Sequence, residues 1–141
     1  MAIILGNKPV IETKEFNDFA LGLSVPIRIA SYDNLNYTVL EQAKSNLLNL
    51  FSTIKGERVQ QPNFGTDLYS LVFDFEDDSL ESKIQDIISK EVSTWVPDVQ
   101  ISQINVTMTD AMKDNNSVGI SLIFNLKNSK QTAEIAVQIK Q

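Results

Sequence analysis

The fold of this chain is decided by residues 46–66, which read NLLNLFSTIKGERVQQPNFGT. The first half has the apolar spacing of an amphipathic helix and runs into the tetrapeptide KGER at 55–58. A loop with Pro62 and the dipeptide FG at 64–65 follows, and the pattern of a second helix begins at once. Because these residues join two elements at fixed spacing, the run is far more specific than any single dipeptide within it.

The residues before and within this run predict a long first helix. Thr38 and Glu41 have the spacing of a capping box, in which each side chain satisfies an otherwise unpaired backbone amide. Apolar residues then recur at helical spacing, so the helix should run over 39–54. Gly56 is well placed to end it in a left-handed conformation. The apolar positions are Leu40, Ala43, Leu47, Leu50, Phe51 and Ile54.

Two further helices are predicted after the loop. Thr66 is placed to cap a short helix over 67–72. A third helix should begin at 78–79, with Glu81 placed to complete a second capping box, and Pro97 should force it to end. The apolar stripe of this helix consists of Leu80, Ile84, Ile87, Ile88, Val92 and Trp95.

Past the third helix the apolar period changes to two, which predicts strands. Strand patterns cover 99–108, 118–126 and 132–139, and the first changes phase near 102–103, where we expect a bulge. Sequential strands joined by short turns predict a three-stranded antiparallel meander whose apolar face the helices cover. The expected fold class is α+β, with two main helices and a short one, in a single domain over 38–141.

Residues 1–37 do not have the pattern of long regular elements and are interpreted as an N-terminal arm. The apolar segment 19–29 contains Gly22 and Pro26, which argue against a long helix or a central strand. The arm either packs on its own domain or docks on a neighbouring subunit, and the sequence favours neither. The apolar run at the N-terminus is too short for a signal peptide, and no stretch approaches the roughly 20 apolar residues of a membrane span. We expect synthesis in the cytoplasm and no membrane partner.

The composition excludes several classes of function. The 141-residue chain contains no cysteine and no histidine. A disulfide, a thiolate nucleophile, a Ser-His-Asp triad and a metal bound through histidine or thiolate are therefore impossible. Only paired carboxylates or a lysine nucleophile remain for catalysis, so we expect no enzyme and no cofactor. The formal net charge of −6 disfavours nucleic acid as a partner, because such a surface repels phosphates.

One group of carboxylates is the candidate for catalysis. A glycoside hydrolase needs two carboxylates across a sugar cleft, one of them with a pKa raised by an apolar wall. An acidic loop before a helix more often caps that helix and complements its dipole. The glycine and the ligand spacing of an EF-hand calcium site are missing. We therefore interpret the group as structural; it comprises Asp74, Glu76, Asp77, Asp78 and Glu81.

Together these motifs resemble the baseplate wedge proteins of contractile-tailed phages, a family that also supplies a baseplate component of type VI secretion systems. The run at 46–66 and the phrase ALGLSVP at 20–26 carry the resemblance, which spans 18–140 by element order and is specific over 46–73. It implies a structural protein of the virion that joins the wedge core and templates the sheath. The implied partners are other baseplate wedge proteins and the tail sheath protein, with tail tube or hub proteins as further candidates.

The resemblance also implies which residues meet the wedge core, since a Gly-Glu-Arg loop followed by Pro-x-Phe-Gly marks this core in the family. The residues at 95–98 fall where the secretion-system branch carries Glu-Pro-Arg, but Val96 replaces the glutamate and Asp98 the arginine. Lys55 and Gly56 also suit a plain helix end, residues 57–58 also suit plain solvation, and the tryptophan at the start of 95–98 also suits core packing. The implied residues are Lys55, Gly56, Glu57, Arg58, Pro62, Phe64, Gly65, Trp95 and Pro97.

The last strand is the candidate surface for the sheath. An open sheet edge presents unpaired amides and carbonyls that can template another strand, and this strand contains no proline. In the family the sheet resembles the connector domain of the sheath subunit, which sheath strands join. The polar residues Thr132, Glu134, Gln138 and Lys140 could instead guard the edge. The implied strand comprises Thr132, Glu134, Ile135, Ala136, Val137, Gln138 and Ile139.

Two other classes of function stay open at this point. A tail-associated peptidoglycan hydrolase is one, because phage tails often carry such enzymes, although the chain has no histidine and no obvious pair of carboxylates that would form a cleft. An adaptor or chaperone of an unrelated assembly is the other. Lysis of cell walls would indicate the hydrolase, and absence from purified particles would indicate the unrelated adaptor.

Overall fold

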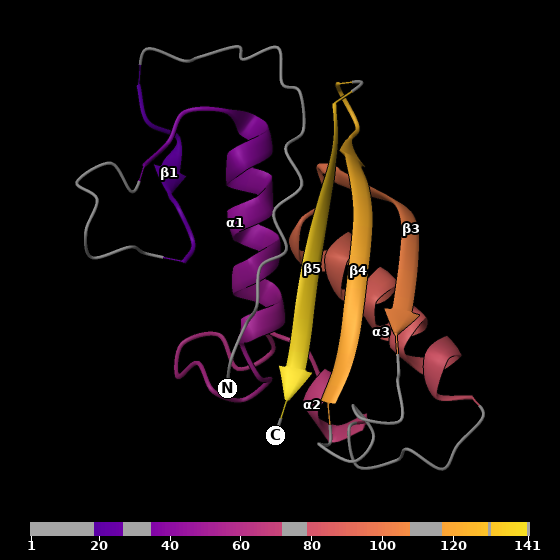
Figure 1. Ribbon diagram of the computed structural model, residues 1–141. Coiled ribbons are helices and arrows are strands. Elements are labelled where there is room, and N and C mark those ends of the chain that lie inside the picture. The colour runs from indigo at the N-terminus through magenta and orange to yellow at the C-terminus, as the bar shows by residue number, and fades with distance from the viewer. Residues whose placement is uncertain (1–18, 27–34, 72–78, 108–116, 130, 141) are drawn as a thin grey trace.

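The computed structural model describes residues 19–26, 35–71, 79–107, 117–129 and 131–140, and it has the α+β architecture that the sequence predicts. A two-stranded ribbon precedes three helices, and a three-stranded sheet follows them (Figure 1). The ribbon consists of β1 (Gly22–Leu23) and β2 (Leu35–Asn36). The helices are α1 (Val39–Ser52), α2 (Leu68–Leu71) and α3 (Leu80–Trp95), and the sheet strands are β3 (Val99–Thr107), β4 (Ser117–Leu126) and β5 (Thr132–Lys140).

The large sheet is an antiparallel meander in which β4 lies between β3 and β5. The register of β5 against β4 is continuous along the whole of β5. The register of β3 shifts at Ser102, so the predicted bulge is confirmed. Ile101 lies opposite Phe124 and Ile104 opposite Leu122, which puts two residues three apart in sequence on the same face of the sheet.

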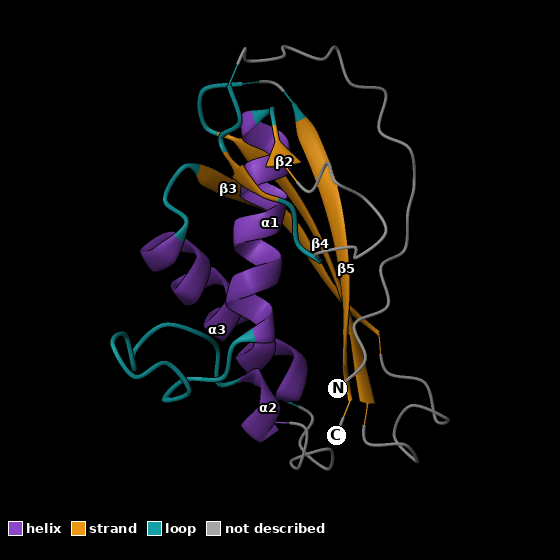
Figure 2. Cartoon of the chain, turned by 90° about the vertical axis from the view of Figure 1, so that its left-hand side faces the viewer, coloured by secondary structure: helices purple, strands orange, loops and turns teal. Residues whose placement is uncertain are grey.

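Both long helices pack on one face of this sheet (Figure 2), and the core fills the space between the two layers. α1 contacts β5 and α3 contacts β3. Burying each large apolar side chain there stabilises the fold by about 1.5–3 kcal/mol relative to leaving it exposed. The buried apolar residues of the helices are Leu40, Ala43, Leu47, Leu48, Leu50, Phe51, Leu68, Leu80, Ile84, Ile88 and Val92, and those of the strands are Val99, Val118, Ile120, Leu122, Phe124, Leu126, Ala133, Ile135, Val137 and Ile139.

The N-terminus of α1 has the predicted capping box. The Thr38 hydroxyl accepts a hydrogen bond from the Glu41 amide at 3.2 Å. In return, the Glu41 carboxylate accepts hydrogen bonds from the Thr38 and Tyr37 amides, both at 3.3 Å. The first turn of the helix therefore meets its hydrogen-bonding needs from local sequence alone, as the spacing of the two residues predicts.

The C-terminus of α1 differs from the prediction, because the helix ends at Ser52 rather than at residue 54. Thr53 is extended, with φ −99° and ψ 128°, and Ile54 forms an isolated parallel bridge with Thr66. An extended backbone in that bridge cannot continue a helix. Gly56 does have a positive φ of +89°, but it lies in the loop beyond the helix, so the predicted helix cap at Gly56 is wrong.

The predicted caps of the later helices are also wrong. Thr66 is fully buried and its hydroxyl has no hydrogen-bond partner, so it does not cap α2. The residue before α3 is Ser79, whose side chain makes no capping hydrogen bond, and Glu81 instead accepts one from Gln85 at 3.3 Å. The end of α3 at Trp95 agrees with the position of Pro97.

The ribbon of β1 and β2 is attached to α1 through a buried amide. The Nδ2 group of Asn36 donates to Ser45 Oγ at 2.9 Å, and lies 3.0 Å from both Gln42 Oε1 and the Leu23 carbonyl oxygen. The Val25 amide donates to the same Ser45 hydroxyl at 3.2 Å. The described residues of the N-terminal arm therefore pack on their own domain.

Gly65 is the point at which the chain returns to the end of α1. The Thr66 amide donates to the Thr53 carbonyl at 2.9 Å, so the two backbones are in direct contact. Gly65 has a φ of +120°, and a Cβ atom there would lie 2.5 Å from the Thr53 carbonyl oxygen. Only glycine combines this backbone conformation with so close an approach.

Replacing Gly65 by alanine should therefore destabilise the protein much more than the same change at Gly56. Gly56 has a positive φ but no atom within 4 Å of an added Cβ, so Gly56→Ala should cost only the conformational strain, about 1 kcal/mol. Gly65→Ala adds overpacking against backbone and should cost about 3 kcal/mol or more. Urea unfolding followed by Trp95 fluorescence measures both, and similar costs at the two positions would contradict this account.

Candidate functional site

The α1–α2 loop, residues 53–67, is closed by its own backbone hydrogen bonds. The Gly56 amide donates to the Pro62 carbonyl at 2.8 Å. Next to it, the Glu57 amide donates to the Ile54 carbonyl at 3.1 Å, and the Glu57 carboxylate accepts from the Ile54 amide at 3.2 Å. The Gly56–Pro62 bond closes the loop around its tip, and the Thr66 amide, which donates to the Thr53 carbonyl, joins its two ends. The tip extends away from the helices (Figure 2).

Arg58 is held against the protein by its own neighbours. Its Nη2 donates to Asn49 Oδ1 on α1 at 3.0 Å, and its guanidinium carbon lies 3.9 Å from the centre of the Phe64 ring, in cation–π contact. The Phe64 ring in turn packs edge to face on Trp95 of α3, with 5.2 Å between ring centres. This stack ties the loop to both long helices.

Glu91 lies beneath the loop as a buried carboxylate, and both of its oxygens are bonded. Lys55 Nζ lies 2.5 Å from Oε1, and Trp95 Nε1 donates to Oε2 at 3.2 Å. The Glu91 side chain is 6% exposed. Lys55 also pairs with Asp67 at 3.1 Å, but the Asp67 side chain is 52% exposed. The pair with Glu91 is therefore the stronger of the two, because water screens the other.

The pKa values of Lys55 and Tyr69 are both raised in the folded protein. The hydrogen bond from Lys55 to Glu91 raises the pKa of Lys55 above its ordinary 10.5, although burial works in the opposite direction. Burial raises the pKa of Tyr69, on α2, above its ordinary 10.0, and the charge of Glu57 adds to that rise. In both cases folding favours the protonated side chain.

The structure brings together four of the residues that the family resemblance implied. Lys55, Arg58, Phe64 and Trp95 join Asn49 and Glu91 in a contact set that we name the loop cluster. The remaining implied residues are not part of this contact set. Gly56 and Gly65 have backbone roles, and Glu57, Pro62 and Pro97 lie exposed on the surface.

Sequence reasoning missed two members of the loop cluster, Asn49 and Glu91. A signal for Glu91 was present, because it lies seven residues after Ile84 and three after Ile88 and therefore shares the apolar stripe of α3. A charged residue in such a stripe requires a partner. No comparable pattern marks Asn49, which lies between two leucines on α1.

The second candidate surface is the outer edge of β5. Among the described residues β5 pairs only with β4, and so does β3, which makes each of them an edge of the large sheet. The side chains of Ala133, Ile135, Val137 and Ile139 point into the core, while Glu134 is exposed. Glu134 accepts a hydrogen bond from Ser121 of β4 at 2.8 Å on the uncovered face.

Within the described ranges, no three carboxylates lie close enough together to hold a metal ion. Of the acidic group that the sequence offered as a candidate for catalysis, the members at 74–78 lie outside those ranges, including Asp78, the alternative start of α3; Glu81 lies exposed on α3. No helix in the described part of the chain is both long and apolar enough to cross a membrane.

Comparison with known proteins matches this chain to a protein family. The family model described as "Baseplate wedge protein gp25" matches residues 38–131, more than half of the chain. A solved structure with a similar fold is a Geobacter sulfurreducens protein described as a candidate tail lysozyme, with a TM-score of 0.65 and 16% sequence identity over 73% of this chain and 91% of that chain. At that identity the likeness shows the fold alone. No curated protein sequence matches the chain.

The pair of Lys55 and Glu91 should contribute measurably to stability. Lys55→Met leaves a buried carboxylate without its cation and should lower the free energy of unfolding by about 2 kcal/mol, less than for a fully buried pair because Lys55 is partly exposed. The matched control is Asp67→Asn, which removes the other carboxylate of Lys55 and should cost less than about 1 kcal/mol. Equal costs in urea unfolding would contradict the assignment.

The dependence of stability on pH gives a second readout. Because the folded protein binds the Lys55 proton more tightly than the unfolded chain does, this stabilisation is fully present below pH 10.5 and is lost as pH rises through the folded pKa. The same sign applies to Tyr69 above pH 10.0. Stability should therefore fall more steeply above about pH 10 in the natural protein than in a Lys55→Met/Tyr69→Phe variant. Parallel profiles would show that neither group is responsible.

Proposed function

This chain belongs to the gp25 family of baseplate wedge proteins, as its sequence motifs predict, and we propose that it joins the wedge core of a contractile tail and templates the first ring of the sheath. As a member of that family it is a structural component of a phage tail baseplate. The family match supports the place in the baseplate, since it covers the three helices, the loop cluster, β3 and β4; it ends at residue 131, before β5, so the role of β5 is proposed from the geometry of the sheet. Two surfaces suit the proposed role.

The edge of β5 supports the assignment to the sheath. A strand that adds to a sheet needs a row of amides and carbonyls in regular register, and β5 contains no proline and no bulge. The opposite edge, β3, carries the bulge at Ser102, which disturbs that row. A sheath strand should therefore pair with β5 and not with β3.

The tip of the α1–α2 loop supports the assignment to the wedge core. Arg58, Phe64 and Gly65 face the protein and hold the loop, and they leave the uncharged segment 59–63 on the surface. Val59 at its tip is 99% exposed. A loop already held in one conformation loses little further entropy on binding, so this segment is suited to meet another wedge protein.

The rival reading as a hydrolase has one observation in its favour, the fold shared with a candidate tail lysozyme. Against it, the chain has no histidine or cysteine, and Glu91, the buried carboxylate among the described residues, is paired with Lys55. Turnover of purified peptidoglycan that Glu76→Gln or Glu81→Gln abolishes would favour the hydrolase. Absence of the protein from purified particles would favour an adaptor of another assembly, and tail tube or hub proteins are further partners to test in those particles.

Proline substitution in β5 should block sheath growth while the wedge still assembles. In an antiparallel edge strand, successive backbone amides point alternately to the neighbouring strand and to the open side. Of two single proline variants at adjacent positions, one therefore removes an amide donor on the open side. We therefore pair Glu134→Pro with Ala133→Pro and use circular dichroism to select the variant that stays folded. Electron microscopy of complemented particles measures sheath length.

Glu134→Ala is the control for that experiment, because it removes the same side chain and keeps the amide. It should leave sheath length unchanged. Full-length sheath on particles that carry a folded proline variant would place the templating surface elsewhere and overturn this part of the proposal.

A charge at the loop tip should prevent entry into the wedge without unfolding the protein. Val59→Asp places a carboxylate at a position with almost complete exposure, so the melting temperature should stay within about 2 °C of the natural value. Ser89→Asp, on the exposed face of α3, is the matched control and should still assemble. Co-purification with the other wedge proteins is the measurement, and normal assembly of Val59→Asp would remove the tip from the interface.

A further inference from the structure

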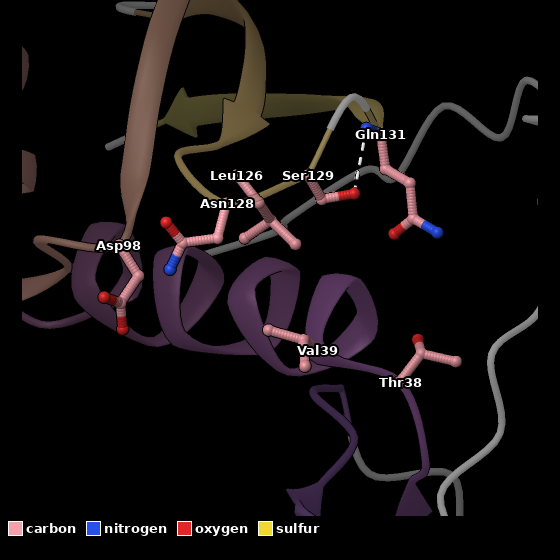
Figure 3. Close-up of a pocket in the computed structure, with 7 residues that line it drawn as sticks. All are labelled: Thr38, Val39, Asp98, Leu126, Asn128, Ser129 and Gln131. Carbon is pink, nitrogen blue, oxygen red and sulfur yellow. Dashed lines mark hydrogen bonds between the residues drawn. The ribbon is translucent and has the colours of Figure 1, made fainter.

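A cleft lies between the start of α1, the start of β3 and the turn that joins β4 to β5 (Figure 3). Its volume is about 390 Å³, enough for one large side chain and part of the segment that carries it. Three segments far apart in sequence form it, so it exists only in the folded domain. The lining residues are Thr38, Val39, Asp98, Leu126, Asn128, Ser129 and Gln131.

The cleft has an apolar middle and polar ends. Val39, 55% exposed, faces the largely buried Leu126, 6% exposed, so the aliphatic surface in the middle comes mainly from Val39. Asp98 and Asn128 lie at one end, and Gln131 lies at the other beside Thr38 (Figure 3). Among the described residues that line the cleft, Asp98 carries the charged side chain.

The rim of the cleft is held in place by the turn itself. The Lys127 amide donates to the Asp98 carbonyl at 3.0 Å, which joins the start of β3 to the end of β4. The Ser129 amide donates to the Leu126 carbonyl, and the Gln131 amide donates to the Ser129 hydroxyl, both at 3.2 Å. The backbone positions of the lining residues are therefore set before any partner arrives.

We propose that this cleft receives an arginine side chain from a partner protein. The Asp98 carboxylate would pair with the guanidinium group, whose planar array of N–H donors also suits the amide oxygen of Asn128. The aliphatic part of the arginine would lie between Val39 and Leu126.

An anionic ligand is the rival occupant, because the N-terminus of a helix favours negative charge. At α1 that preference is already met: the Glu41 carboxylate accepts from the Tyr37 and Thr38 amides, and the Thr38 hydroxyl accepts from the Glu41 amide. Asp98 would also repel an anion. The described lining residues therefore favour a cation over an anion.

The test is a titration of the full-length, isotope-labelled protein with N-acetyl-arginine methylamide, followed by amide chemical shifts. Saturable shifts should appear at Val39, Leu126 and Asn128. Asp98→Asn should weaken binding about tenfold, because it removes the charge and keeps the shape. Asp86→Asn, which makes the same change on the exposed face of α3, should leave binding unchanged.

The capped citrulline derivative is the matched ligand, because it has the shape of arginine without the charge, and it should bind no better than the Asp98→Asn variant binds arginine. The proposal is overturned if the arginine probe causes no saturable shifts, if citrulline binds equally well, or if Asp98→Asn has the natural affinity. This inference does not depend on the proposed role in the baseplate, since no wedge or sheath protein takes part in the measurement.

Discussion

The burial of Glu91 is the constraint on which the candidate site depends. Removing a carboxylate from water costs several kilocalories per mole unless a cation and hydrogen-bond donors replace the lost solvent. Here Lys55 supplies the cation and Trp95 supplies a donor. Lys55 lies three residues after the end of α1 at Ser52, so pairing it with Glu91 brings the start of the loop onto α3. The need to pair the buried charge of Glu91, on the apolar face of α3, therefore sets the position of the loop.

The residues that the family resemblance implied in this loop are of two kinds in the structure. On sequence alone, Arg58 and Phe64 were candidates for contact with a partner protein. In the structure the Arg58 side chain contacts Asn49 and Phe64, and the Phe64 ring packs on Trp95. Both side chains hold the loop, and the residues left on its surface, 59–63, are uncharged. A preformed loop of this kind suits a component that must enter one assembly in one orientation.

The sheet has a comparable asymmetry. Two helices cover one face, so partners are left with the other face and the two edges. The bulge at Ser102 makes β3 irregular, while β5 keeps an unbroken register. The same bulge lets Ile101 and Ile104 both face the core, so one local irregularity serves packing and distinguishes the edges. The cleft near Asp98 lies between the start of α1 and one end of the sheet. It differs from the sheet edges, because Asp98 offers a charged side chain where the edges offer backbone amides and carbonyls.

The sequence by itself determined the elements and their order. Apolar periods of 3.6 and two residues, the capping box at Thr38 and the change of phase at Ser102 are local patterns, and a local pattern specifies local structure. The family also followed from motifs read along the chain. Only the tertiary structure decided where α1 ends, why Thr66 is buried, and which way Arg58 faces. Those features rest on contacts such as Ile54 with Thr66, which closes the loop, and Lys55 with Glu91, whose partners lie 36 residues apart and meet only when the loop packs on α3.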